Sequence, residues 1–178
     1  MDEIQVLYCQ NGTLMREGAG VKLRRYIGAD RKNDCDPILL LDYFDSDNPM
    51  DYIGGFPQHP HRGFETVTYL LHGTMKHQDN QGHEGVIGPG DVQWMTAGRG
   101  LMHSEMPAQL EGRLSGVQLW LNLPHASKLI PPAYQEFTHD DFLVEHHDNG
   151  TVIKVIAGKT DKGTRSPLRE IATDPLLF

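Results

Sequence analysis

The chain has 178 residues, enough for one ordinary domain or for one domain and part of another. With 24 acidic and 16 basic residues its net charge is −8, a sign that disfavours binding to phosphate backbones and anionic lipids. The longest aliphatic run, residues 38–41, is far shorter than the roughly 20 residues that cross a bilayer, and residues 1–4 are acidic where a secretory signal is basic. We therefore expect a soluble, cytoplasmic protein that binds neither nucleic acid nor membranes.

Short β-type segments, separated by glycine and proline turns, occupy the first two thirds of the chain. Residues 21–27 alternate approximately, as a half-buried strand does, and residues 38–44 are apolar enough for a strand buried on both faces. Further strands are predicted over residues 64–71, 75–78, 85–87, 92–95, 101–106 and 117–123. Many short strands with almost no helical period predict an all-β fold, a sandwich or a barrel.

The pattern changes after Pro124. Residues 124–150 contain a Pro-Pro pair and an acidic stretch, and they predict a connection with one short helix around residues 126–129. Residues 151–157 predict a further strand. The final residues 174–178 are mostly apolar, which is typical of a chain that stops where another strand begins.

Two pairs of metal-ligating residues stand at a spacing of two. His59 and His61 flank Pro60, and in an extended chain side chains at i and i+2 leave the same face, so both imidazoles can reach one ion. His103 and Glu105 repeat this spacing. Two such segments facing each other supply three nitrogens and one carboxylate, a set that suits Fe(II), Mn, Ni, Cu or Zn and leaves positions open for water, oxygen or substrate. Pro60 cannot donate to a ladder, which predicts an edge strand or a bulge.

The residues near these pairs have two interpretations each. Arg62 and Glu65 either orient the first pair through hydrogen bonds or form a structural ion pair. Arg99 lies between two glycines and is a candidate gate or anion contact. Three residues either line a pocket or, as we favour, pack in the core: Trp94, Met95 and Met102. The remaining histidines are predicted to be exposed: His72, His77, His83, His125, His139, His146 and His147.

Several sequence blocks carry a family resemblance: residues 56–73 (FPQHPHRGFETVTYLLHG), 89–107 (PGDVQWMTAGRGLMHSEMP), 116–124 (GVQLWLNLP), 131–135 (PPAYQ) and 155–158 (VIAG). They resemble the pirin family of the cupin superfamily. This resemblance implies a cupin β-barrel that holds one metal, usually iron, on His59, His61, His103 and Glu105. The general cupin pattern would instead nominate Glu65 as the carboxylate ligand.

The resemblance also implies a domain organisation. Pirins continue into a second cupin-like domain, and this chain ends at Phe178, where that domain would begin. We therefore expect residues 1–130 to form an N-terminal metal-binding cupin domain. Residues 131–178 would then be a connecting segment and the truncated start of a second domain.

Two main functions agree with the resemblance. The first is an Fe(II)-dependent dioxygenase of the quercetin 2,3-dioxygenase type, which takes dioxygen and a flavonol or other phenolic or enolic substrate. In that reaction Glu105 either remains a ligand or accepts a hydroxyl proton. The alternative is an iron-dependent regulatory module that binds a transcription factor or a metabolic enzyme without turnover. A metal-dependent isomerase, or a cupin whose site has lost catalysis, is a third interpretation.

Overall fold

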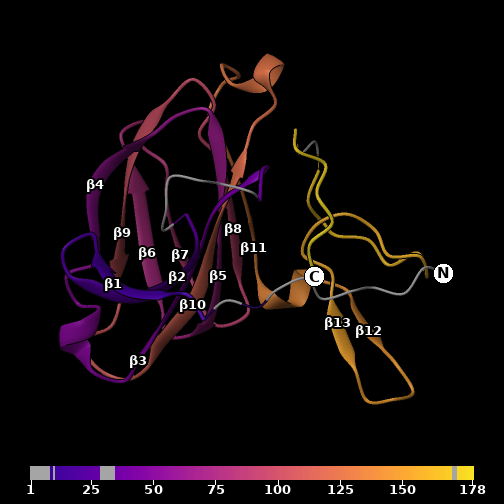
Figure 1. The fold of residues 1–178 in the computed structure, drawn as a ribbon, viewed down its shortest axis with the longest axis horizontal. Coiled ribbons are helices and arrows are strands. Elements are labelled where there is room, and N and C mark those ends of the chain that lie inside the picture. Colours follow the sequence, from indigo (N-terminus) through magenta and orange to yellow (C-terminus); the bar gives the residue numbers. More distant parts are fainter. Residues whose placement is uncertain (1–8, 10, 29–34, 170–171) are drawn as a thin grey trace.

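The chain is described by a computed structural model over residues 9, 11–28, 35–169 and 172–178, so residues 1–4 lie outside the described part. Its strands form two packed sheets and a separate hairpin (Figure 1). The larger sheet has the order β1-β2-β3-β10-β5-β8-β11. Its strands are Thr13–Glu17 (β1), Val21–Ile27 (β2), Ile38–Ser46 (β3), Leu114–Asn122 (β10), Phe64–His72 (β5), Val92–Thr96 (β8) and Ala133–Phe137 (β11).

The smaller sheet has the order β4-β9-β6-β7 and faces the larger one (Figure 1). Its strands are Phe56–His61 (β4), Leu101–Pro107 (β9), Met75–Asp79 (β6) and Glu84–Ile87 (β7). The hairpin pairs Val144–His146 (β12) with Val152–Lys154 (β13). The structure therefore confirms the all-β prediction. Among the named strands no ladder joins the edges of the two sheets, so of the two predicted forms, a sandwich or a barrel, these strands form the sandwich.

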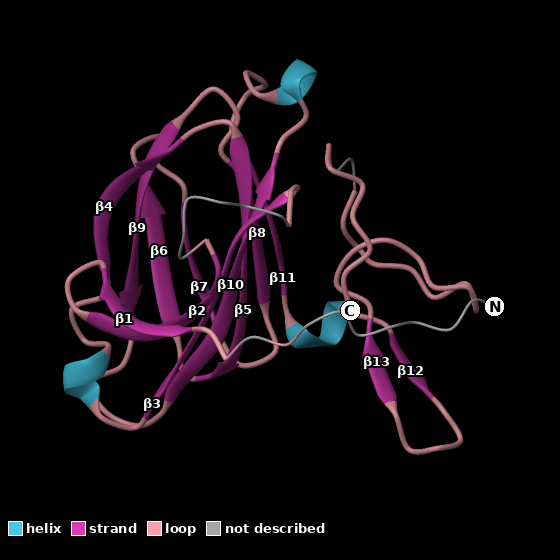
Figure 2. Cartoon of the chain, viewed as in Figure 1, coloured by secondary structure: helices cyan, strands magenta, loops and turns pink. Residues whose placement is uncertain are grey.

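Helical structure in the described residues is limited to three short 3-10 turns at the ends of strands (Figure 2). They are Pro49–Asp51 (η1), His125–Ser127 (η2) and His139–Asp141 (η3). The second of these lies where the sequence predicts a short helix. Within the described part of the chain, no helix is long and apolar enough to cross a membrane.

The larger sheet is covered on both faces. Between the two sheets, Leu23, Phe44 and Leu70 pack against Met75 and Ile87 of the smaller sheet. On the outer face a second core forms around Val67, Trp94, Leu119, Phe142, Ile156 and Leu168. The last three of these residues follow β11, and Figure 1 shows this C-terminal part of the chain beside β8 and β11. Burial on both faces explains why the central strands β5 and β8 are apolar or buried along most of their length.

Several strands match the sequence prediction and others depart from it. β2 has the predicted bounds. In β3 only Leu40, Asp42 and Phe44 are buried, so the strand alternates and is not buried on both faces. β11 and β12 lie in the segment predicted as a connection, and β11 pairs with β8 of the main sheet. The larger sheet therefore extends beyond residue 130.

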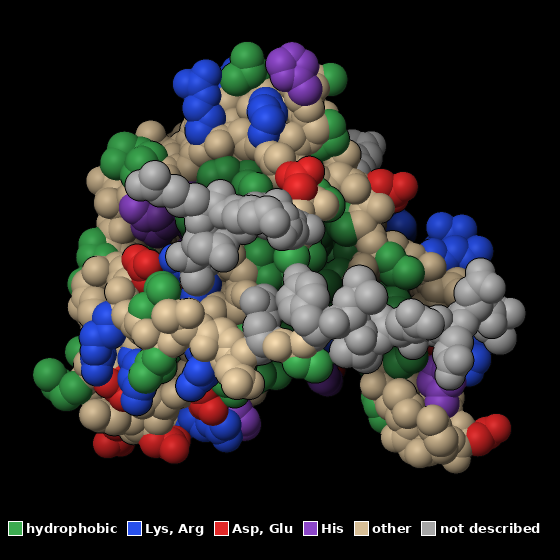
Figure 3. Space-filling model, viewed as in Figure 1, with side chains coloured by type: hydrophobic (Ala, Val, Ile, Leu, Met, Phe, Trp, Pro, Cys, Tyr) green, Lys and Arg blue, Asp and Glu red, His purple; other side chains and the backbone are tan. Residues whose placement is uncertain are grey.

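Charges of both signs are mixed on the surface near β1 and β3 (Figure 3). Asp51 lies 2.6 Å from Arg16 and 3.5 Å from Lys22, and Arg113 lies 2.7 Å from Asp45. Asp51 is buried, but its two basic partners have exposed side chains, as has Arg113, and ion pairs at the surface typically stabilise a fold by less than about 1 kcal/mol. We therefore attribute the stability of this region mainly to the core beneath it.

Candidate metal centre

The antiparallel pair β4–β9 brings the histidines together. Its register places His59 opposite His103 and His61 opposite Leu101. Because side chains alternate along a strand, His59, His61 and His103 all leave the same face of the smaller sheet. β4 is an edge strand, as Pro60 predicts.

The three imidazoles form a compact cluster. Their ring centroids are 4.6 Å apart for His59–His61, 4.6 Å for His59–His103 and 4.8 Å for His61–His103. One ring nitrogen from each lies within 4.8 Å of the others. His61 and His103 are only 5% and 1% exposed, and His59 is half-buried. The cluster is therefore reached from the side of His59.

Burial favours the uncharged imidazole at His61 and at His103. Burial, and then the neighbouring imidazoles, lower the pKa of His61 and of His103 to about 3. The Nδ1 of His59 lies 2.8 Å from the carbonyl oxygen of Pro57, which can only accept, so Nδ1 carries the proton. The Nε2 lone pair of His59 then faces His103 Nε2 at 3.1 Å. Neutral nitrogens converging in this way are the donor set that a divalent transition metal takes.

Glu105 lies on the same strand face as His103 and is 2% exposed, but its carboxylate is outside the three-histidine group. Both of its oxygens accept hydrogen bonds from Gln118 Nε2, at 3.1 and 2.9 Å, and Oε1 accepts a bond from the Thr68 hydroxyl at 3.2 Å. The structure therefore gathers three of the four predicted ligands. It holds the fourth residue against β10 and β5.

A cavity of about 230 Å³ lies beside the cluster. Its walls include Arg25, Asp42, Phe56, His59, Gln118 and Trp120. The Trp120 ring meets His61 edge-on at 5.1 Å and stacks on Phe64 at 4.7 Å. Sequence reasoning assigned no role to Gln118 or Trp120. The alternation of residues 117–123 nevertheless placed both on one side of their strand, which is the signal that could have found them.

Comparison with known proteins identifies the family. The pirin family model matches residues 20–121, more than half of the chain. This chain belongs to the pirin family. A pirin-like protein from Caulobacter vibrioides is 54% identical over 173 residues, which cover 97% of this chain and 63% of the relative. The chain therefore spans less than two thirds of that relative's length.

Solved structures confirm the cupin fold that the resemblance predicted. A quercetin 2,3-dioxygenase from Acinetobacter baumannii superposes with a TM-score of 0.81 at 36% identity, covering 90% of this chain and 58% of that one. A bacterial pirin from Escherichia coli, solved in complex with nickel(II), has a TM-score of 0.58 at 26% identity. That match covers 71% of this chain and 54% of the pirin.

The residues predicted near the ligand pairs have different surroundings. Arg62 and Arg99 are exposed, and neither side chain bonds to a described residue. Glu65 accepts hydrogen bonds from Thr96 and Thr173, each at 2.8 Å. These bonds lie on the face of β5 opposite to Thr68, because odd and even positions of a strand point in opposite directions. The structure thus places Glu65 away from the histidines.

The three predicted pocket residues do not line the cavity beside His59. Trp94 packs in the outer core, as the core interpretation predicts. Met95 packs in a small core with Leu101. Met102 is 39% exposed on the face of β9 opposite to His103. The core interpretation therefore holds for Trp94 and Met95 and is wrong for Met102.

One histidine predicted to be exposed is buried. His77 is 2% exposed, because the alternation along β6 turns Met75, His77 and Asp79 inward. It lies close to His83 and Glu136, the second group of potential metal ligands in the described residues. His72, His125, His139 and His146 are exposed as predicted, and His147 is half-buried.

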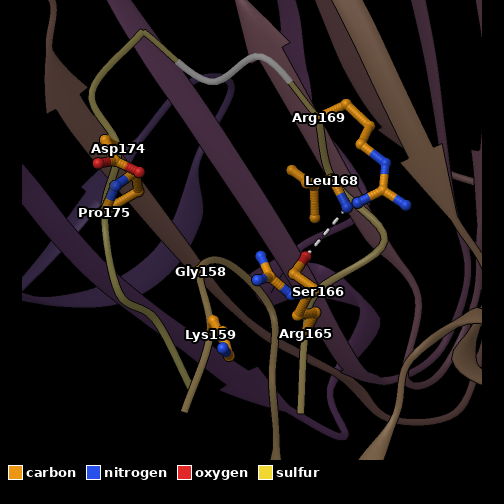
Figure 4. Close-up of a pocket in the computed structure, with 8 residues that line it drawn as sticks. All are labelled: Gly158, Lys159, Arg165, Ser166, Leu168, Arg169, Asp174 and Pro175. Carbon is orange, nitrogen blue, oxygen red and sulfur yellow. Dashed lines mark hydrogen bonds between the residues drawn. The ribbon is translucent and has the colours of Figure 1, made fainter. Parts of the chain in front are cut away.

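A separate cavity of about 240 Å³ lies in the C-terminal segment (Figure 4). Its lining includes Lys159, Arg165, Ser166, Leu168, Arg169 and Asp174. Ser166 Oγ accepts a hydrogen bond from the backbone of Leu168 at 3.0 Å, which closes one wall. None of the lining residues belongs to the histidine cluster.

Proposed function

We propose that this chain binds one Fe(II) on His59, His61, His103 and Glu105 and acts with dioxygen on a flavonol of the quercetin type. The observation that carries the proposal is the approach of His59 Nε2 to 3.1 Å from the Nε2 of His103, whose buried imidazole has a strongly lowered pKa. The likeness to a quercetin 2,3-dioxygenase and to a nickel-bound pirin supports a metal and a phenolic substrate. Imidazole and carboxylate together suit non-haem iron, and nickel is the alternative metal.

In this proposal the three histidines hold the metal, and two features of their surroundings favour its binding. The Pro57 carbonyl fixes the tautomer and orientation of His59. The low pKa of His61 and His103 keeps both nitrogen lone pairs free at neutral pH. When bound, the metal supplies Lewis acidity toward the oxygens of a phenolic or enolic substrate and redox chemistry with dioxygen.

In the proposal Glu105 is either the fourth ligand or the proton acceptor. Gln118 and Thr68 both donate hydrogen bonds to its carboxylate and hold it at the β5–β10 side of the site. A rotation of the Glu105 side chain away from Gln118 would bring it toward the histidines. The two hydrogen-bonding residues therefore control which role the carboxylate takes.

The cavity beside His59 suits a flat aromatic substrate. The ring of Trp120, stacked on Phe64, provides an apolar wall next to the imidazole of His61. Arg25, Asp42 and Gln118 provide polar groups for substrate hydroxyls on other walls. This combination of one aromatic wall and several polar groups matches a polyphenol better than an aliphatic acid.

The first prediction tests turnover. The metal-free chain is loaded anaerobically with Fe(II), mixed with quercetin and exposed to air, and the flavonol absorbance and released carbon monoxide are followed. We expect iron-dependent bleaching with carbon monoxide release, and loss of both in His59→Ala. The matched control His72→Ala changes an exposed histidine at the end of β5 and should retain activity. Iron bound to the histidines without turnover would refute the enzyme and favour the regulatory module.

A further inference from the structure

A second group of ligand-type side chains lies on the β6–β7 side of the smaller sheet, where the register sets His77 opposite Glu105 of β9. His77 comes from β6, His83 from the turn before β7, and Glu136 from β11 of the larger sheet. His77 Nε2 and His83 Nε2 lie 2.6 and 3.0 Å from the same carboxylate oxygen, Glu136 Oε1. One atom of each residue lies within 4.8 Å of the others. The group therefore connects the edge of one sheet to the edge of the other.

The buried imidazole of His77 makes no hydrogen bond of acceptable geometry to a described residue, although its Nε2 lies close to Glu136. Its side chain is 2% exposed and points at Glu136, and both ring nitrogens lack such a bond within the described part of the chain. Buried polar atoms without such bonds are uncommon and call for an explanation. A cation bound between the two imidazoles and the carboxylate would use the Nε2 lone pair of His77.

The surrounding residues hold the group in place. Tyr134 stacks on His83 with ring centroids 4.0 Å apart, and its ring is also nearly parallel to that of His77. The backbone N–H of His83 donates to Asp79 Oδ1 at 2.9 Å, which fixes the turn. Gln93 Nε2 donates to Glu136 Oε1 at 2.9 Å and orients the carboxylate. Such supporting contacts are typical of residues that surround metal ligands.

Gly85 leaves the space that the group occupies. It lies opposite His77 in the β6–β7 register. A Cβ atom at this position would lie 2.5 Å from His77 Nε2 and 2.7 Å from Glu136 Oε2, closer than real Cβ contacts allow. Any other residue at position 85 would therefore displace the ligand atoms.

We propose that His77, His83 and Glu136 form a second metal site, which binds a divalent transition cation such as Zn²⁺. Two imidazoles and one carboxylate are a common ligand set for zinc and leave a fourth position for water. The side chain of His83 is 36% exposed, which gives a cation access from solvent. Because no residue is shared with the candidate iron centre, this proposal does not depend on the proposed function.

Counting bound zinc tests the second site. The metal-free chain is saturated with Zn²⁺, freed of excess metal by gel filtration and analysed for zinc per chain. We expect two zinc ions in the wild type, one in His83→Ala, one in His59→Ala and none in the double variant. His72→Ala, which lies in neither group, should retain two.

A second readout separates ligand loss from misfolding. In His59→Ala, which retains only the second site, Zn²⁺ should raise the melting temperature, and His83→Ala in the same background should remove that shift. If His83→Ala fails to fold by circular dichroism, Glu136→Gln replaces it and should likewise leave one zinc. A wild-type chain that binds one zinc, lost in His59→Ala and retained in His83→Ala, would overturn the proposal and leave a metal-free hydrogen-bonded group.

Discussion

At the residue scale, the spacing of the candidate ligands was predictable and their environment was not. The pairs His59–His61 and His103–Glu105 follow from the two-residue repeat of an extended chain. The carboxylate of Glu105, however, is held by Gln118, a residue from another sheet. Likewise, no local pattern showed which face of β6 would be buried, so His77 was predicted to be exposed. Contacts between sheets decide both cases, and they follow from packing that a single sequence does not display.

Burial of His61 and His103 makes the stability of the metal-free fold depend on pH. Their pKa is about 3 in the folded chain and near 6.5 in the unfolded chain, so between these values only the unfolded chain binds the protons. The contribution of these histidines to the free energy of unfolding is therefore fully present above pH 6.5 and decreases as the pH falls toward 3. Each histidine contributes a slope of about 1.4 kcal/mol per pH unit.

Denaturant unfolding of the metal-free chain between about pH 6.5 and 4.5 measures this slope, above the range where most carboxylates titrate. His103→Asn should reduce the loss of unfolding free energy per pH unit, whereas His72→Asn should leave it unchanged. Equal slopes for His103→Asn and the wild type would show that burial does not depress the pKa of His103.

At the scale of elements, alternation of apolar and polar residues correctly predicted the strands that bury one face in a core. β10 shows this: Leu119 and Leu121 face the outer core, while Gln118 and Trp120 line the cavity. β11 was missed because it has only five residues, of mixed polarity, directly after a Pro-Pro pair. Its pairing with β8, about forty positions earlier in the chain, makes it a strand.

Gly116 allows β10 to lie close to its neighbours. A Cβ at this position would lie 2.7 Å from both the Phe44 ring and the Tyr69 carbonyl oxygen. We therefore expect Gly116→Ala to overpack the sheet and to reduce the free energy of unfolding by about 1–3 kcal/mol. Gly88→Ala is the matched control, because the nearest atom to its Cβ would be at an ordinary 3.6 Å. Equal denaturation midpoints for the two variants would contradict this explanation.

At the scale of the whole molecule, the segment after β11 packs on the outer face of the larger sheet. Phe142, Ile156 and Leu168 cover the outer face of the larger sheet, and Leu177 packs against the same core. The pirin resemblance predicted a connection and the truncated start of another domain over residues 131–178, and that division stays a prediction. The packing shows that these residues also bury the side chain of Trp94.

Removing one of these covering side chains should destabilise the sandwich itself. Phe142 is 5% exposed, and truncation of a buried phenylalanine typically costs about 3–5 kcal/mol. We expect Phe142→Ala to lower the unfolding free energy by that amount in a single cooperative transition. The control Val144→Ala changes a side chain that is 39% exposed and should have little effect. If Phe142→Ala left the midpoint unchanged, the segment would be a separate unit that merely touches the sheet.

The position of two histidines on an edge strand has a consequence for self-association. An uncovered edge presents unpaired backbone donors on which a strand from another molecule can add, which is a route to aggregation. β4 carries Pro57 and Pro60, neither of which has a backbone N–H to offer. The same prolines that separate and flank the histidines therefore make this edge a poor template for fibre growth, and they leave it accessible to small molecules.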